Sequence, residues 1–150
     1  MGLVSNRNPN YCFIDGQNLE TGLKNQDLEV DYSLLYNYLV GKYFIKKVFY
    51  CIKYSNYRQE FYRDLERIGY TLVFSSGMGN SRIDGSHKVN VDADLIVTAL
   101  EKYVVVEKFG CILISGDGDF VPLIRFFERQ KEFVKIISTD RKFNLKNVKF

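Results

Sequence analysis

The stretch "GCILISGDGDFVPLIRFFERQ" occupies residues 110 to 130 and determines how the rest of the chain is interpreted. It begins with an apolar run of strand length, which ends abruptly at two aspartates, Asp117 and Asp119, separated by one glycine. The remainder is amphipathic, and Pro122 is tolerated in the first turn of a helix. The stretch therefore predicts a strand, an acidic turn and a helix.

The acidic turn has two interpretations. Asp-Gly pairs favour turns, and Asp119 is placed to cap the following helix. Alternatively, the two carboxylates are held close together to bind a metal ion. The rest of the chain has to decide between these two interpretations.

The same alternation of strand and helix runs through the chain. Five strands are predicted, at residues 11–15, 46–54, 70–76, 110–115 and 133–138. Four helices are predicted, at residues 31–43, 56–69, 91–109 and 120–130. This order predicts an α/β fold of three layers, with a central parallel sheet covered by helices on both faces. Ligands of such sheets bind at the carboxyl ends of the strands, where the strand order reverses.

Composition is that of an ordinary globular protein. The 150 residues are 46% hydrophobic and 26% charged, which excludes a disordered or fibrous chain. We predict one domain over 1–150, with a flexible N-terminus at 1–9 and a basic C-terminal tail at 139–150. An irregular stretch at 77–90, rich in Gly, Ser and Asn, has the length of a functional loop.

Cysteine usage and hydropathy indicate a cytoplasmic protein. Cys12, Cys51 and Cys111 are far apart, and each sits in an apolar run without a Cys-x-x-Cys pair. They are therefore expected to be buried free thiols in a reducing compartment. No signal peptide is recognisable, and no apolar stretch approaches the ~18 residues of a membrane span.

The charge is concentrated at one end of the chain. The formal net charge is only +3, but the segment 125–150 contains eight basic and three acidic residues. A basic end of this kind attracts phosphate backbones, although a solvated terminal segment has the same composition.

Further carboxylates are predicted to meet the acidic turn. Asp15 ends the first strand in "FIDGQN", as Asp117 and Asp119 follow the fourth. If these two strands are neighbours at the switch point, the three carboxylates open into one crevice.

A fourth carboxylate comes from the predicted helix 91–109. Asp92 lies in its first turn, on the stripe that faces the sheet, together with Ile96, Ala99 and Tyr103. Asp94 shares the opposite face and is expected to point outward or to act as a cap. Taken alone, Asp92 could simply interact with the positive end of the helix dipole.

Four converging carboxylates would repel one another unless a cation compensates their charge. Hard divalent ions such as Mg²⁺ or Mn²⁺ prefer oxygen ligands, and sites of this kind hydrolyse phosphodiesters. Asn18 could orient a water molecule or contact the scissile phosphate. Ser115, Lys88 and Arg82 are further candidates for contacts with the substrate.

Three stretches together resemble the NYN domain family, PIN-like nucleases that include the LabA-like proteins. They are "FIDGQNL" (13–19), "KVNVDADLIVTAL" (88–100) and "LISGDGDFVPLI" (113–124), in the order that is typical of the family. The resemblance implies a Rossmann-like sheet with strand order 3-2-1-4-5 and metal-dependent cleavage of RNA.

The resemblance also implies which residues form the site. The acids of the family fall on Asp15, Asp92, Asp117 and Asp119, with Asn18 as their polar partner. Many relatives carry a further acid near the position of Thr98, for which Asp94 is the candidate substitute in this chain.

Two other functions stay open. One is a non-catalytic RNA-binding module that uses the basic tail and stacks bases on Tyr54 and Tyr57. The other is a metal-dependent phosphatase with Asp15 as nucleophile, although Gln17 stands where such enzymes usually have a second aspartate. The sequence leaves open whether the RNA is single-stranded or structured, and whether the protein forms a homodimer.

Overall fold

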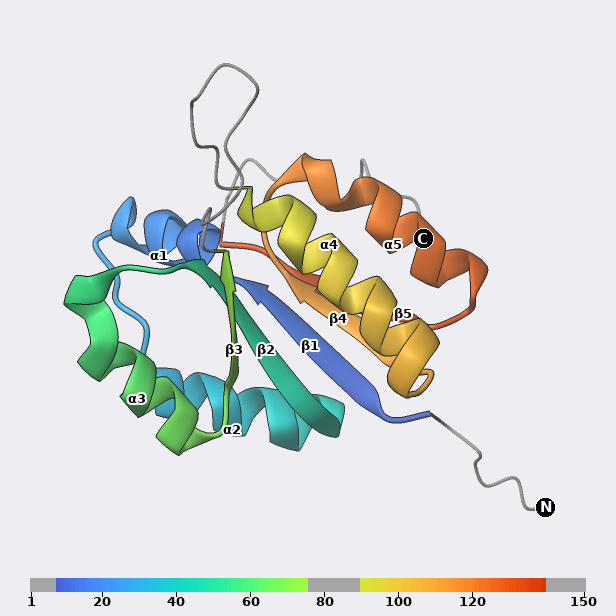
Figure 1. Ribbon diagram of the computed structural model, residues 1–150, viewed down its shortest axis with the longest axis horizontal. Helices are drawn as coiled ribbons and strands as arrows, with labels where there is room; N and C mark the ends of the chain where they lie inside the picture. Colours follow the sequence, from blue (N-terminus) through green and yellow to red (C-terminus); the bar gives the residue numbers. More distant parts are fainter. Residues whose placement is uncertain (1–7, 76–89, 140–150) are drawn as a thin grey trace.

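The computed structural model describes residues 8–75 and 90–139, and its centre is a five-stranded, all-parallel sheet of order β3-β2-β1-β4-β5 (Figure 1). The strands are β1 (Asn10–Asp15), β2 (Ile45–Lys53), β3 (Thr71–Ser75), β4 (Gly110–Ile114) and β5 (Phe133–Ile137). The predicted sheet and its strand order are confirmed.

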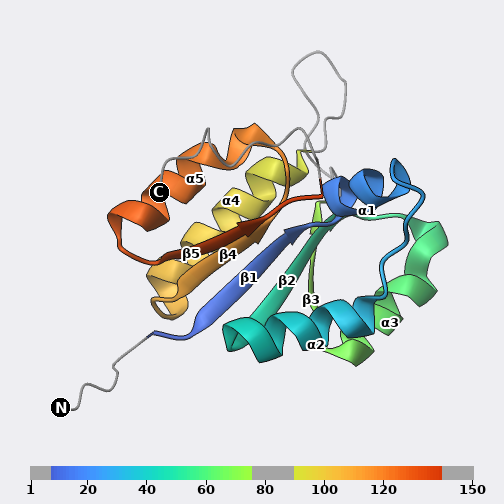
Figure 2. The ribbon, with the colours of Figure 1, turned by 180° about the vertical axis from the view of Figure 1, so that it is seen from behind.

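Helices cover both faces of the sheet, as Figures 1 and 2 show from opposite sides. On one face lie α1 (Gly16–Lys24), α2 (Tyr32–Tyr43) and α3 (Gln59–Ile68), and on the other lie α4 (Val91–Glu101) and α5 (Val121–Arg129). The predicted three-layer α/β architecture is therefore confirmed. Among the described residues, no helix combines the length and the apolar character that crossing a bilayer requires.

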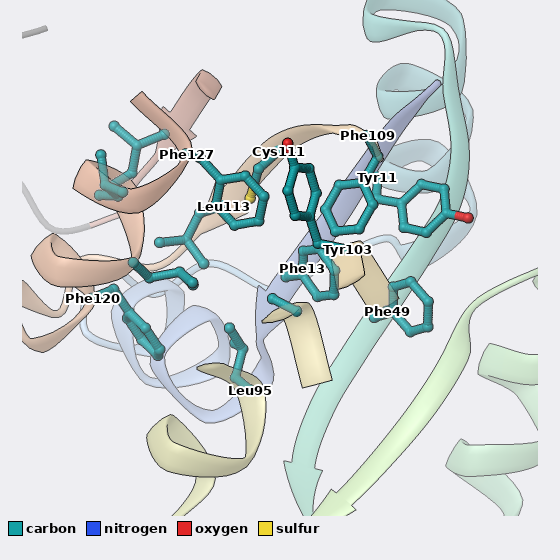
Figure 3. Packing of buried hydrophobic residues seen from close by; sticks show 14 of the residues in the cluster. Tyr11, Phe13, Phe49, Leu95, Tyr103, Phe109, Cys111, Leu113, Phe120 and Phe127 are labelled. Atoms are coloured by element: carbon teal, nitrogen blue, oxygen red, sulfur yellow. The ribbon is translucent and has the colours of Figure 1, made fainter. Parts of the chain in front are cut away.

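Each face of the sheet has its own apolar core. Between the sheet and α4 and α5, the aromatic rings pack closely (Figure 3). Tyr11 stacks on Phe109 with ring centroids 4.2 Å apart, and Phe13 stacks on Phe49 at 5.0 Å. Burial of such large rings is a major part of the hydrophobic stabilisation of the fold.

Local capping signals set several helix ends as predicted. The Asp31 side chain accepts the N–H of Leu34 at 3.0 Å and caps α2. Gly69 ends α3 with φ at 133°, a conformation that side chains rarely adopt. Pro122 lies in the first turn of α5, where its missing N–H costs no intrahelical hydrogen bond.

One helix, α1, was not predicted. Its sequence "GQNLETGLK" contains two glycines and only two leucines, so it carries little helical signal. The helix packs so closely on the sheet that a Cβ at Gly16 would lie 2.5 Å from the ring of Tyr50. Tertiary packing thus selects glycine here against its low helix propensity.

The predicted helix 91–109 was too long. The α-helix α4 ends at Glu101, and a π-helical turn follows at Lys102–Val106. Val104, Val105 and Val106 are β-branched and lose side-chain freedom in a helix. Their exposure of 76%, 78% and 53% gives the segment little packing energy to offset this loss.

The sheet has its switch point at β1, which lies between β2 and β4. The register pairs Ile14 with Ile114 on β4 and pairs Asp15 with Cys51 on β2. The residues that follow β1 and β4 therefore emerge side by side at the carboxyl edge of the sheet.

Candidate functional site

Asp15 ends β1 and is the most buried carboxylate of the site, with 4% of its surface exposed. Its Oδ1 accepts the N–H of Asn18 at 3.3 Å, which caps α1, and its Oδ2 accepts the hydroxyl of Ser115 at 3.2 Å. Burial raises the pKa of Asp15, the two hydrogen bonds lower it, and the charge of Asp117 raises it again, with a net increase.

Asp117 lies in the turn between β4 and α5. Its Oδ1 accepts the N–H of Asp119 at 2.9 Å, so that it caps a short 3-10 turn. Its own N–H donates to Ser115 Oγ at 3.1 Å. The buried Ser115 hydroxyl therefore holds both Asp15 and Asp117. Since capping engages only one oxygen of Asp117, the turn interpretation and the metal-site interpretation are compatible.

Asn18 connects the turn after β4 to the start of α1. Its Oδ1 accepts the N–H of Gly116 at 2.8 Å. With one lone pair of this oxygen occupied, the amide N–H groups are the larger part of the hydrogen-bonding capacity that the side chain has left for a ligand. Asn18 is thus better suited to donate to a phosphate oxygen or a water molecule than to bind a cation.

Asp92 enters the site from the first turn of α4. The helix is capped by Asn90, whose side chain accepts the N–H of Ala93 at 2.9 Å. Burial raises the pKa of Asp92 to about 7, together with a hydrogen bond to Asp117 and the neighbouring carboxylate charges. Asp92 forms no ion pair with a described residue.

The three carboxylates converge from three separate segments. One ligand oxygen from each of Asp15, Asp92 and Asp117 lies within 4.8 Å of the others. They face a cleft of about 470 Å³ that is lined also by Gln17, Asn18, Thr21, Asn90, Val91 and Asp119. None of these lining residues is cationic, and the ion pairs among the described residues lie elsewhere.

The donor set fits a divalent cation. All the converging ligand atoms are carboxylate oxygens, which Mg²⁺ and Mn²⁺ prefer. A cation would stabilise the ionised form of Asp92, whose pKa is raised by burial and by the neighbouring carboxylates. Soft metals would instead favour thiolate ligands, and Cys51, the nearest cysteine along the sheet register, is buried beneath the site.

The two remaining predicted acids lie outside this cluster of three. Asp119 is exposed and lines the rim of the cleft. Asp94 accepts a hydrogen bond from the buried hydroxyl of Ser75 at the end of β3. The residue is exposed, but its carboxylate reaches back to the end of β3 instead of pointing outward.

The predicted substrate contacts divide into three groups. Ser115 is 1% exposed and does not line the cleft, and its hydroxyl is bonded to Asp15 and Asp117. Tyr54 lines a neighbouring cleft and Tyr57 is 98% exposed. Arg82 and Lys88 lie outside the described residues.

Three residues that line the cleft were not predicted from the sequence. Gln17 and Thr21 line it from α1, and Asn90 lines it from the cap of α4. The one signal for α1 was Asp15, an acid at the end of a strand and in the N-cap position of the helix that follows.

Comparison with known proteins supports the fold and the family. The model of the NYN domain matches residues 11–149, nearly the whole chain. No protein of curated function shows significant sequence similarity to it.

One solved structure is similar in fold. It is the crystal structure of a protein of unknown function, VPA0982, from Vibrio parahaemolyticus RIMD 2210633. The sequences are 20% identical, the match covers 93% of this chain and 98% of the other, and the TM-score is 0.69. At this identity the likeness establishes the fold alone.

Proposed function

The chain belongs to the NYN domain family of PIN-like nucleases, and from this premise we propose that it hydrolyses phosphodiester bonds of RNA with Mg²⁺ or Mn²⁺ as cofactor. The observation that carries the proposal is the convergence of Asp15, Asp92 and Asp117, with no cationic side chain among the described residues that line the cleft. Carboxylates that repel one another are typical of sites where a bound cation compensates their charge.

The three carboxylates would hold the cation. When bound, a divalent cation supplies Lewis-acid activation of water and neutralises charge on the phosphodiester. Ser115 and the start of α1 keep Asp15 in position, and the cap hydrogen bond keeps Asp117 in position. Such fixed ligands avoid reorganisation during the reaction.

Two polar side chains that line the cleft would act on the substrate. Asn18 lines the cleft, and its amide N–H groups are suited to donate to a phosphate oxygen. Asp119 is exposed and lines the cleft, where its carboxylate would accept a proton or serve as a further ligand.

The test is cleavage of an end-labelled single-stranded RNA by the purified protein. We expect cleavage with Mn²⁺ or Mg²⁺, none with EDTA, and none by Asp117→Asn. Glu66→Gln, an exposed substitution on α3, is the matched control and should cut like the wild type.

The two alternatives give different results in the same assay. RNA binding without any cleavage would favour a non-catalytic RNA-binding module. Hydrolysis of a generic phosphomonoester with intact RNA would favour a phosphatase, whose second aspartate is replaced by Gln17 in this chain.

Location and assembly are additional proposals. Cys12, Cys51 and Cys111 are free and buried, which suits a reducing compartment such as the cytoplasm. A homodimer, and the choice between single-stranded and structured RNA, remain predictions.

A further inference from the structure

A second cleft lies beside the aspartate cleft. Its volume is about 520 Å³, and Gln17 and Thr21 line both clefts. Lys24 continues the same face of α1 into the second cleft, because residues spaced by four and three positions share one face of a helix. The exposed face of α1 is therefore a continuous wall from one cleft to the other.

The charge of the second cleft is opposite to that of the first. Lys24, Lys53 and Arg58 line it, and Glu20 is the one carboxylate among its described lining residues. Glu20 is already compensated, since Arg58 donates hydrogen bonds to its two oxygens at 2.8 and 3.2 Å. Both lysines are exposed, and neither forms an ion pair with a described residue. Two ammonium groups are thus available to an anionic ligand.

An aromatic ring completes the second cleft. Tyr54 is 41% exposed, and its ring centroid lies 5.8 Å from that of Tyr62 and 5.3 Å from that of Phe74. Tyr62 is buried, and its hydroxyl accepts the N–H of Ser55 at 2.9 Å, so the support is fixed. A ring that is supported on one side and open on another can stack a nucleic-acid base.

We propose that the second cleft binds the nucleotides flanking the scissile bond on one side of a single-stranded RNA, with phosphates on Lys24 and Lys53 and a base on Tyr54. This inference rests on the proposed nuclease function and adds to it the path of the strand. Arg58 lines the same cleft but is already held by Glu20 and by the ring of Phe61, whose centroid lies 4.2 Å from the guanidinium carbon. It therefore supports the cleft and is not one of the proposed phosphate ligands.

The acidic character of the aspartate cleft is a reason to expect a separate cationic cleft for RNA. Its carboxylates repel the phosphates of RNA, so a single cation cannot supply both the neutralisation of the site and the affinity for a strand. Affinity for single-stranded RNA comes from cationic side chains along the backbone and from stacking. Among the described residues, the second cleft offers both features along the wall that it shares with the aspartates.

Binding of RNA is the direct test. The affinity for a fluorescently labelled single-stranded RNA is measured by anisotropy with Mg²⁺, in the Asp117→Asn background to prevent cleavage. Lys24→Gln combined with Lys53→Gln should weaken binding about 10- to 30-fold at ~0.1 M salt and reduce the slope of log K against log salt by about 1.4. Tyr54→Ala should weaken binding roughly 5- to 100-fold, and Tyr54→Phe should restore it.

Two control variants separate a specific cleft from general charge and aromaticity. Lys108→Gln removes an exposed cation at the opposite end of the sheet, just before β4. Phe44→Ala removes a ring that is 81% exposed, lies just before β2 and does not line the cleft. Both should bind RNA like the background protein, and melting temperatures verify that every variant is folded.

The outcomes distinguish this inference from the proposed function. If wild-type protein cuts RNA while the variants in the second cleft bind like their background, the second cleft is refuted and the nuclease stands. If wild-type protein neither binds nor cuts RNA, the proposed function fails and this inference fails with it. Weaker binding in the cleft variants alone supports the path from the aspartates along α1.

Discussion

Replacing Asp92 with asparagine is expected to stabilise the metal-free protein at pH 8 and to abolish its response to divalent cations. The ionised carboxylate of Asp92 faces Asp15 and Asp117 at close range. Asparagine has nearly the same shape but no charge, so it removes the repulsion and also removes a ligand. Opposite effects of one substitution on stability and metal binding would be a signature of a cation site.

The magnitude follows from the pKa of Asp92, which is raised from 3.8 to about 7. Each tenfold change in proton affinity is worth ~1.4 kcal/mol, which sets an upper limit of ~4 kcal/mol. Solvent screens this partly exposed carboxylate, so we expect about 1–2 kcal/mol. For a chain of this length the gain corresponds to roughly 2–8 °C in melting temperature.

The effect has a definite dependence on pH. Because the folded state raises the pKa of Asp92, it binds the proton more tightly than the unfolded state does. The stability conferred by the protonated carboxyl is therefore lost as the pH rises through about 7. The advantage of Asp92→Asn over wild type should be fully present at pH 8 and should shrink by more than half by pH 5.

Thermal melts in EDTA at both pH values measure this advantage, and a second set with Mn²⁺ measures the response to metal. Glu66→Gln removes a carboxylate that is exposed on α3 and should melt like the wild type under every condition. An Asp92→Asn protein that is less stable than wild type at pH 8 in EDTA would refute the argument. It would show that the carboxylate is stabilised, rather than repelled, by its surroundings.

Three further predictions concern the support of the site. Mn²⁺ at ~100 times its dissociation constant should stabilise the wild type by about 2.7 kcal/mol, which raises the melting temperature by roughly 5–11 °C. In the same melting titration, Asp117→Asn should lose most of this shift, and an equal shift would exclude Asp117 as a ligand. Ser115→Ala removes the hydroxyl that donates to Asp15 and leaves the N–H of Asp117 without its acceptor. Urea denaturation should therefore show a free energy of unfolding that is lower by about 1–3 kcal/mol, and a Mn²⁺ titration should show a weaker affinity for the metal. Gly16→Ala places a Cβ 2.5 Å from the buried ring of Tyr50. The same denaturation assay should show a free energy of unfolding that is lower by about 1–3 kcal/mol, whereas unchanged stability would mean that the ring moves aside.

Much of the fold could be predicted because the relevant interactions are local. Alternation of apolar runs identified the five strands to within about one residue. Asp31 and Gly69 set helix ends through hydrogen bonds and backbone geometry within a few residues. The helix α1 escaped prediction because its stability comes from packing on the sheet, with Gly16 chosen for space rather than for helix propensity.

The sequence by itself determined that acids follow β1 and β4 and that another acid begins α4, since each depends on its own segment. Only the tertiary structure decided which of them meet, because the strand order and register set the distances between segments. It brings Asp15, Asp92 and Asp117 together and leaves Asp119 at the rim and Asp94 bonded to Ser75. The second cleft likewise exists only because α1, β2 and the following turn pack against one another, which periodicity along a single segment does not encode.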